Sequence, residues 1–228
     1  MDGNRRWAKA RFLPVALGHA AGARRVREVV QACSDRGVRF LTLFAFSTEN
    51  WQRPADEVSS LMGLLALYLN NEVKNMRSMG VRFKVAGDVS KFDSRIQTMI
   101  EEAQASTAHN TTITLTVAVN YGGRQDIVQA VQAWQNANPN LAATDITESG
   151  ISQHLGLAHA PDPDLMIRTG GESRISNFLL WQMAYTEMCF SNVLWPSFSE
   201  KDLDSAIAWY RTCERRFGGA PVELAHHA

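Results

Sequence analysis

The sequence predicts an α/β fold in which a mostly parallel central sheet is flanked by helices. Two observations support this fold class. Short apolar runs typical of strands alternate along the 228 residues with segments whose apolar residues recur every three or four positions. The helical segments are also long enough to connect neighbouring parallel strands. No linker-like segment divides the chain, so we expect a single domain over residues 1–219, followed by a flexible tail over 220–228.

The strands are expected where apolar and β-branched residues cluster, at residues 39–46, 81–87, 113–120 and 164–169. Helices are expected between and after them, at residues 20–36, 57–79, 92–107, 124–134 and 200–216. Gly37 and Gly80 follow two of these helices and are expected to end them. Residues 136–149, rich in Asn, Ala and Thr, are expected to form a surface connection.

Composition narrows the class of function. Lys plus Arg and Asp plus Glu number 23 each, so the overall charge gives no footprint for nucleic acid, and any anion site must be local. Three widely spaced cysteines indicate neither a disulfide framework nor a zinc site, which fits a reducing cytosol. The longest nearly apolar run, residues 61–69, is far shorter than the ~20 residues that span a bilayer. We therefore expect a cytoplasmic protein.

Residues 165–176, Leu-Met-Ile-Arg-Thr-Gly-Gly-Glu-Ser-Arg-Ile-Ser, carry the clearest chemical signal. An apolar strand runs into a turn that contains Arg168, Arg174 and Ser176. Gly170 and Gly171 let the backbone approach a ligand and adopt positive φ. Two guanidinium groups six residues apart can donate paired hydrogen bonds to phosphate oxygens. This segment predicts an anion pocket.

A second polar cluster opens the chain with Met-Asp-Gly-Asn-Arg-Arg-Trp. Asp2, Gly3 and Asn4 could form no more than a turn and a helix cap. Asp2 with Arg5 and Arg6 also suits a metal diphosphate, since a carboxylate binds a hard cation and the free N–H groups at the start of a helix receive phosphate oxygens. Together with the turn after Arg168, this cluster indicates an enzyme that acts on diphosphates.

Other polar segments have equally ordinary alternatives when taken singly. Residues 47–53 could be a solvated loop, residues 120–124 an ordinary strand-to-helix turn, and His19 after Gly18 a helix cap or a surface residue. The joint occurrence of these segments at strand ends favours a shared site, because ligands of parallel α/β sheets bind beyond the carboxyl ends of the strands. The four clusters expected to meet are residues 2–6, 47–53, 120–124 and 168–176.

Several of these segments resemble, in order and over nearly the whole chain, the motif series of the cis-prenyltransferases, in particular the bacterial members. The motifs are Met-Asp-Gly-Asn-Arg-Arg-Trp-Ala at 1–8, Gly-His at 18–19, Phe-Ser-Thr-Glu-Asn-Trp-Gln-Arg-Pro at 46–54, Asn-Tyr-Gly-Gly-Arg at 120–124, Ile-Arg-Thr-Gly-Gly-Glu-Ser-Arg-Ile-Ser-Asn-Phe at 167–178 and Arg-Arg-Phe-Gly-Gly at 215–219.

The resemblance implies an α/β fold with a hydrophobic tunnel and a Mg²⁺-dependent reaction. Such enzymes add isopentenyl diphosphate units to farnesyl diphosphate with cis double bonds, giving a long polyprenyl diphosphate for the lipid carrier of cell-wall synthesis. The resemblance also implies a homodimer whose interface lies near residues 200–219. It further implies a peripheral contact with the inner face of the plasma membrane for product release.

The resemblance assigns roles residue by residue. Asp2 is implied to coordinate Mg²⁺ and help the diphosphate leave, Glu187 to be a second metal-associated carboxylate, and Asn50 to lie near the departing proton. Arg168, Arg174 and Ser176 are implied to bind isopentenyl diphosphate. The allylic substrate and the loop over the site are assigned to Gly3, Asn4, Arg5, Arg6, Trp7, His19, Ser47, Glu49, Trp51 and Arg53, with Glu57 shaping the same loop.

The helix at residues 61–69 is apolar on more than one side, which is usual for a buried core helix. By resemblance it lines the tunnel instead, with small Ala45 leaving the tunnel open and Ile113 helping to close its far end. The chain departs from the family pattern in Val15, where an arginine is usual, and in Ser173, often histidine. An apolar strand is expected before Asp2, upstream of Met1.

A noncatalytic partner subunit of a prenyltransferase is the alternative function, with Arg216-Phe217-Gly218 completing a partner's site. Such subunits lose the metal and loop residues, whereas Asp2, Asn50, Arg168, Arg174 and Ser176 are all present here. The sequence therefore favours the enzyme.

Overall fold

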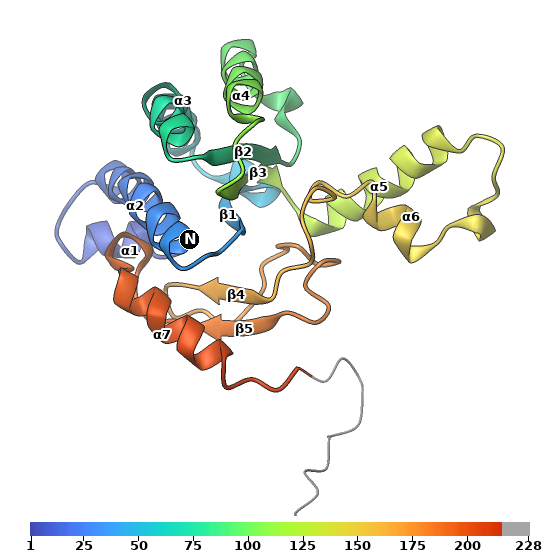
Figure 1. The fold of residues 1–228 in the computed structure, drawn as a ribbon. Coiled ribbons are helices and arrows are strands. Elements are labelled where there is room, and N and C mark those ends of the chain that lie inside the picture. Colours follow the sequence, from blue (N-terminus) through green and yellow to red (C-terminus); the bar gives the residue numbers. More distant parts are fainter. Residues whose placement is uncertain (216–228) are drawn as a thin grey trace, which may run out of the picture.

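In a computed structural model, described over residues 1–215, two small parallel sheets are covered by helices (Figure 1). The larger sheet has the order β1 (Phe40–Ser47), β3 (Ile113–Tyr121), β2 (Val81–Ala86). The smaller sheet pairs β4 (Leu165–Arg168) with β5 (Glu187–Phe190). All three strand pairs are parallel, which confirms the predicted fold class. β5 was not predicted.

Long helices connect and cover the strands, as the sequence predicts. They are α1 (Asn4–Lys9), α2 (Val15–Asp35), α3 (Ala55–Ser78), α4 (Ser94–Thr107), α5 (Gly123–Ala137), α6 (Glu148–Ser152) and α7 (Glu200–Tyr210). In Figure 1, α3 and α4 lie over β2, α7 lies beside β5, and α5 with α6 extends away from the sheets as an arm. Residues 136–149, expected as a surface connection, include the end of α5 and the start of α6.

Helix α2 begins five residues earlier than predicted, and this places His19 inside a helix. Gly18 is a packing residue, because a Cβ there would lie 2.3 Å from the backbone oxygen of Asn4 in α1. The interpretation of this glycine and His19 as a helix cap is therefore wrong. Gly37 and Gly80 do follow helices with positive φ, as predicted.

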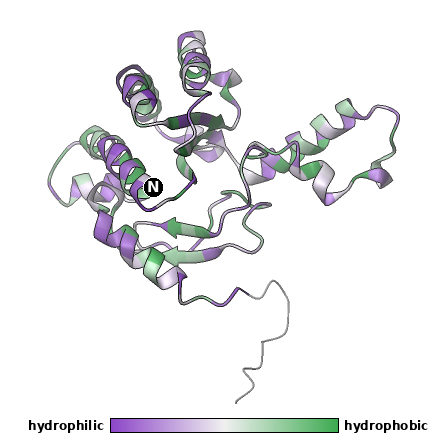
Figure 2. Cartoon of the chain, viewed as in Figure 1, coloured by the Kyte–Doolittle hydropathy of each residue, from purple (hydrophilic) through white to green (hydrophobic). Residues whose placement is uncertain are grey.

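The core is centred on β3, which is buried along most of its length. Leu115 and Val119 of this strand pack with Phe83 of β2 and Leu43 of β1, and Figure 2 shows hydrophobic residues along these strands. The register of β1 against β3 shifts between Phe44 and Phe46, so Ala45 forms an irregularity in the ladder. Bulges of this kind re-aim side chains near functional sites.

The C-terminal predictions are only partly tested. α7 ends at Tyr210 instead of residue 216, and residues 211–215 follow without regular structure. The expected tail at 220–228, the domain end at 219 and the Arg216-Phe217-Gly218 motif lie outside the described residues. The strand expected upstream of Met1 stays a prediction. Among residues 1–215, no helix has both the length and the hydropathy needed to cross a bilayer.

Candidate active site

Asp2 is held where the N-terminal segment meets the end of β4. Its backbone N–H donates to Thr169 Oγ1 at 2.9 Å, and its carbonyl accepts from the same hydroxyl at 3.0 Å. Arg168 Nη2 donates to Asp2 Oδ2 at 3.1 Å, while Arg6 Nη2 lies 3.5 Å from Oδ1. The carboxylate of Asp2 is thus fixed between two guanidinium groups.

This environment keeps Asp2 ionised. Partial burial acts to raise its pKa, but the hydrogen bond from Arg168, the Gly3 N–H and the charges of Arg168 and Arg6 outweigh burial and lower the pKa. Near neutral pH, Asp2 therefore presents a negatively charged oxygen pair to a ligand or cation.

The turn after β4 folds back over Arg168. Gly170 and Gly171 have φ of 92° and 76°, and a Cβ on Gly170 would approach Arg6 Nη2 to 2.8 Å. Arg168 Nη1 donates to Ser176 Oγ at 2.8 Å and to the carbonyl of Arg174. The guanidinium of Arg174 itself is exposed and binds Glu172 at 2.5 Å. The turn therefore brings the side chains of Arg168 and Ser176 together, whereas the Arg174 side chain turns to Glu172. Their binding of an anion stays a prediction.

A second charged group is centred on Glu57 at the start of α3, whose side chain is only 10% exposed. Its carboxylate lies 3.5 Å from Arg5 Nη1, 3.2 Å from Arg53 Nη1 and 3.4 Å from His19 Nε2. Three expected site residues from different segments therefore converge on one buried carboxylate.

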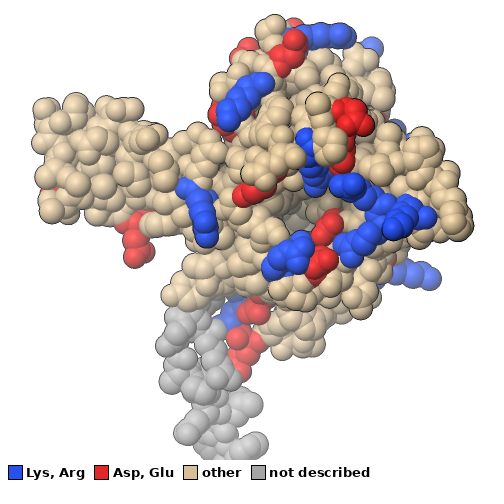
Figure 3. Space-filling model, turned by 180° about the vertical axis from the view of Figure 1, so that it is seen from behind, with Lys and Arg blue, Asp and Glu red and all other residues tan. Residues whose placement is uncertain are grey.

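Hydrogen bonds connect the remaining clusters. Glu49 accepts from the Asn177 side chain at 2.8 Å, and Asn177 in turn accepts the Arg124 backbone N–H at 2.9 Å. Trp51 Nε1 donates to Asn120 at 2.7 Å. Of the four segments predicted to meet, residues 2–6 contact 168–176 and residues 47–53 contact 120–124 directly, while Glu57 and Asn177 link the two pairs. Figure 3 shows a hollow on one face of the molecule, with Lys and Arg side chains gathered around it and Asp and Glu side chains among them.

The segment around Asn50 forms a short 3₁₀ turn, Thr48–Gln52. Asn50 Oδ1 accepts the backbone N–H of Ser47 at 3.0 Å, so these two residues cap the turn. Trp51 packs against Phe46, with ring centres 5.2 Å apart. These side chains thus fix the turn at the edge of the site.

An apolar cavity of about 130 Å³ runs between the helices and β1 and β3. One end of the cavity is lined by Met1, Asn4 and His19. Met1 and Asn4 are close to Asp2 in sequence, and His19 contacts the Glu57 carboxylate. The rest is lined mainly by apolar side chains, namely Ala23, Val26, Leu43, Ala45, Phe46, Leu61, Met62, Leu64, Leu65, Tyr68, Phe83, Val117, Val119 and Trp195, with Gly22 beside them. Of the residues predicted to line a tunnel, Ala45, Leu61, Met62, Leu64, Leu65 and Tyr68 line this cavity. Leu67 is instead exposed, and Leu69 is buried in the core. Ile113 is buried in the core without lining this cavity, so its expected role in closing it is wrong.

Two buried polar atoms at the charged end of the cavity, Asn4 Oδ1 and His19 Nε2, make no hydrogen bond of good geometry within residues 1–215. Buried polar groups are normally satisfied, so such atoms indicate a place for a ligand or water. The arrangement suits a molecule with an anionic head and a long apolar tail.

A sequence model of the family described as "Putative undecaprenyl diphosphate synthase" matches residues 1–218. The chain belongs to this family. It is 53% identical to an isoprenyl transferase of Ralstonia nicotianae over 224 residues, covering 98% of this chain and 87% of that protein. It is 50% identical over 220 residues to a Vibrio vulnificus protein named ditrans,polycis-undecaprenyl-diphosphate synthase ((2E,6E)-farnesyl-diphosphate specific), covering 96% and 88% of the two chains.

Solved structures agree with this membership of the undecaprenyl diphosphate synthase family. Lavandulyl diphosphate synthase from Lavandula x intermedia, in complex with dimethylallyl diphosphate, has a TM-score of 0.91 at 37% identity and covers 96% of this chain and 95% of its own. A probable undecaprenyl diphosphate synthase from Campylobacter jejuni has a TM-score of 0.79 at 33% identity, covering 87% and 92%. The resemblance stated from the motifs is therefore confirmed.

Two residues that the family resemblance assigned to the site make contacts outside the two charged groups. Glu187 opens β5 opposite Leu165, at the other end of the short ladder from Arg168, and burial together with the Glu187 carboxylate raises the pKa of the Cys213 thiol. Trp7 donates to Ser197 at 2.9 Å and stacks under Arg11. Residues 1–215 contain no group of three or more metal-ligating His, Cys, Asp or Glu side chains. The metal role of Glu187 and the substrate role of Trp7 stay predictions.

Some residues of the site escaped prediction. Thr169 clamps the backbone of Asp2, and Asn177 links two loops through its side-chain amide. Glu57 was expected only to shape a loop, yet it joins three basic groups. The only hint of this role in the sequence was that Glu57 follows Arg53 by four residues, a spacing usual for helical ion pairs.

His19 provides a test of this geometry through pH. Burial lowers the pKa of His19 despite the opposing effect of Glu57, so the folded protein binds fewer protons here than the unfolded chain. The contribution of a neutral His19 to stability is present above the ordinary pKa and is lost as the pH falls through the lowered value. We expect the free energy of unfolding, measured in urea, to fall less between about pH 7.5 and about pH 5 in His19→Gln than in the parent. Equal falls would show that His19 is not held neutral.

Proposed function

We propose that this chain is a Mg²⁺-dependent cis-prenyltransferase that condenses isopentenyl diphosphate repeatedly onto farnesyl diphosphate. The proposal rests mainly on one observation: an apolar cavity lies beside a charged cluster in which Arg6 and Arg168 hold the ionised carboxylate of Asp2. The name of the Vibrio vulnificus relative supports both the allylic primer and the cis products.

The charged groups divide into two subsites. Arg168, Arg174 and Ser176 bind the diphosphate of isopentenyl diphosphate. Arg6 and His19, with the backbone around Gly3 and Asn4, hold the allylic diphosphate, whose tail enters the cavity lined by Ala45 and α3. The fixed positive charge of Arg6, placed where the leaving diphosphate gains charge, stabilises the transition state more than the bound substrate.

The donor chemistry at Asp2 fits magnesium. Mg²⁺ in proteins commonly takes one or two carboxylates and fills its other positions with phosphate oxygens and water. Asp2 is ionised and partly exposed, and it can exchange an arginine contact for a cation. When bound, Mg²⁺ neutralises charge on the departing diphosphate. Glu187 is proposed as the second metal-associated carboxylate.

The reaction forms a bond from the isopentenyl double bond to the allylic carbon as the allylic carbon–oxygen bond breaks. A proton then leaves to give the new cis double bond. Asn50 lies on the loop nearest this step, but an amide is a poor base, so the released diphosphate or water accepts the proton. Trp51 and Arg53 exclude water from above the site.

The growing chain is retained by burial. At ~0.8 kcal/mol per buried CH₂, each five-carbon unit gains roughly 3 to 4 kcal/mol. We further propose that the product is a long polyprenyl diphosphate for the lipid carrier of cell-wall synthesis. The enzyme then acts as a homodimer in the cytoplasm, with a peripheral contact at the inner face of the plasma membrane.

Tyr68 is proposed to limit product length. Its side chain lines the apolar cavity and also a smaller pocket of about 10 Å³ that includes Arg27 and Glu72, so it separates the two. Tyr68→Ala is expected to lengthen the main product by one or more isoprene units, because the two spaces would join. Tyr68→Phe keeps the ring and is expected to keep the product. An unchanged length in Tyr68→Ala, read by mass spectrometry, would contradict this role.

The function itself is tested by mass spectrometry of lipids formed from farnesyl diphosphate, isopentenyl diphosphate and Mg²⁺, with EDTA as control. A metal-dependent ladder of products that differ by one isoprene unit is the expected result. Absence of product from a folded chain with Mg²⁺ would overturn the proposal and favour the noncatalytic subunit.

A further inference from the structure

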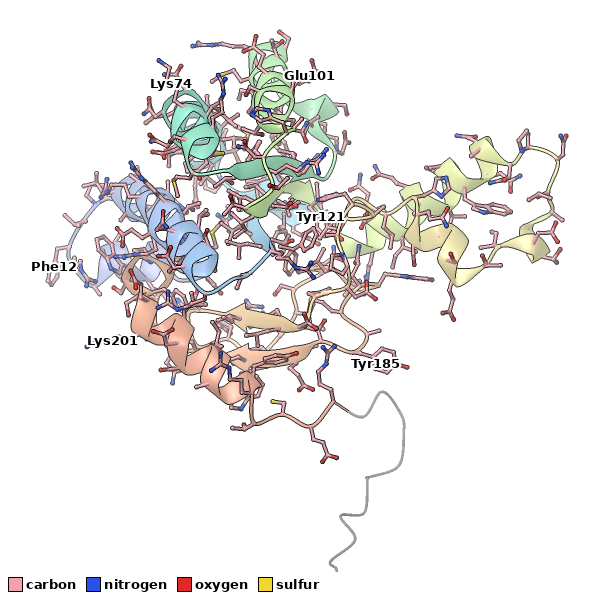
Figure 4. All side chains as sticks on the ribbon, viewed as in Figure 1. Phe12, Lys74, Glu101, Tyr121, Tyr185 and Lys201 are labelled. Carbon is pink, nitrogen blue, oxygen red and sulfur yellow. The ribbon has the colours of Figure 1, made fainter. Side chains whose placement is uncertain are left out.

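The connection between α1 and α2 exposes a run of apolar residues, which we call the α1–α2 tip, residues 9–17. All nine residues are exposed. Seven of them are apolar, namely Ala10, Phe12, Leu13, Pro14, Val15, Ala16 and Leu17. Phe12 is 98% exposed, and Figure 4 shows it at the outer edge of the molecule. Contiguous apolar surface of this kind marks an interaction site.

The backbone at Phe12 points to the same conclusion. Its φ is 55°, a left-handed conformation that glycine adopts freely and that a bulky residue rarely takes. An aromatic ring that is 98% exposed gains almost no burial to offset this strain. Residues whose backbone strain is not offset by packing within the fold tend to occur at functional positions.

Charge around the tip indicates the class of partner. Residues 3–17 contain four basic side chains, Arg5, Arg6, Lys9 and Arg11, and no acidic one, although the whole chain has no net charge. Arg5 and Arg6 pair with Glu57 and Asp2, whereas Lys9 and Arg11 form no ion pair within residues 1–215. Arg11 contacts Trp7, so its charge is not neutralised by a carboxylate. Apolar side chains flanked by cations without an acidic partner are typical of surfaces that bind anionic membranes.

We propose that the α1–α2 tip inserts Phe12 and Leu13 into the interface of an anionic phospholipid bilayer, with Lys9 and Arg11 against the headgroups. A second copy of the chain fits less well, since a symmetric contact would bring the same cations face to face. The six residues of α1 span about 9 Å, so docking would hold Asp2 close to the bilayer. The inference names the surface for the proposed membrane contact, and binding requires no turnover.

The test is co-sedimentation of the full chain with vesicles of phosphatidylcholine alone or with about one third phosphatidylglycerol. Binding is expected only to the anionic vesicles. Phe12→Gly is expected to lower the partition coefficient about tenfold or more. Glycine adopts the positive φ without strain, so a lost contact cannot be attributed to misfolding. Lys9→Glu is expected to weaken binding as well. Leu141→Ser, at a residue 45% exposed in the loop after α5, is the matched control and should bind normally.

The proposal is overturned if the parent chain does not bind anionic vesicles or if Phe12→Gly binds them as well as the parent. It is equally overturned if Leu141→Ser loses as much vesicle binding as Phe12→Gly. It is also overturned if Phe12→Gly leaves vesicle binding intact but dissociates a dimer in light scattering, which would make the tip a contact between copies. Prenyl transfer by Phe12→Gly in detergent should equal that of the parent. The two assays therefore distinguish a loss of vesicle binding from a loss of the proposed enzyme activity.

Discussion

Replacing Asp2 with alanine is expected to lower kcat by about a thousandfold or more, because the ionised carboxylate that holds the proposed Mg²⁺ would be gone. The fold should persist. Asp2 is partly exposed, its backbone remains clamped by Thr169, and Arg168 keeps its bond to Ser176. We expect unfolding in urea to show a loss of about 1 to 2 kcal/mol.

Asp2→Asn is the matched control for this experiment. The asparagine side-chain oxygen can still accept the hydrogen bond from Arg168, but it carries no charge and binds hard cations weakly. It should therefore restore stability without restoring turnover. Near-normal turnover in either variant, measured by incorporation of labelled isopentenyl diphosphate, would defeat the assignment of Asp2 as the metal carboxylate.

Replacing Arg168 with alanine is expected chiefly to raise the KM for isopentenyl diphosphate, by about 10- to 100-fold. A hydrogen bond to a charged group contributes about 1.5 to 3 kcal/mol, and ~1.4 kcal/mol corresponds to a tenfold change in affinity. The structure adds a second cause, since Arg168 also holds the turn through Ser176 and the Arg174 carbonyl. The measurement is steady-state kinetics with each substrate varied in turn.

Two comparisons separate binding from positioning. Arg168→Lys keeps the charge, but an ammonium group cannot donate to Asp2 and Ser176 at once as the planar guanidinium does. This variant should therefore recover only part of the lost affinity for isopentenyl diphosphate. Arg174→Ala removes an exposed guanidinium that holds no other loop, and it should raise the same KM without loss of stability. If only the KM for farnesyl diphosphate changed, the division of the two subsites would be reversed.

The candidate site was largely predictable because it is encoded in short segments. The Gly170-Gly171 turn with its arginines, the Asp2 cluster and the strand-end position of each segment follow from local residue chemistry. Their convergence follows from parallel strands, whose carboxyl ends meet at one edge. The existence of the larger helices and four strands was readable for a similar reason, since periodicity reflects which face of an element is buried.

The tertiary structure decided what depends on residues distant in sequence. Whether α3 was a core helix or a cavity lining turned on Leu61, Leu65 and Tyr68 facing Ala45 and Val117 across a space that no single segment reveals. Gly18 proved to be a packing residue because α1 lies against it. The role of Glu57 depended on Arg5 and His19 arriving from other helices.

The sequence by itself therefore determined the fold class, the family and the chemical character of the site, because these arise from local patterns and motif residues. Only the tertiary structure decided which charges pair, where the apolar cavity runs, and that Phe12 stands unpacked at a strained turn. Those features depend on distances between chain segments, and distances are set by packing.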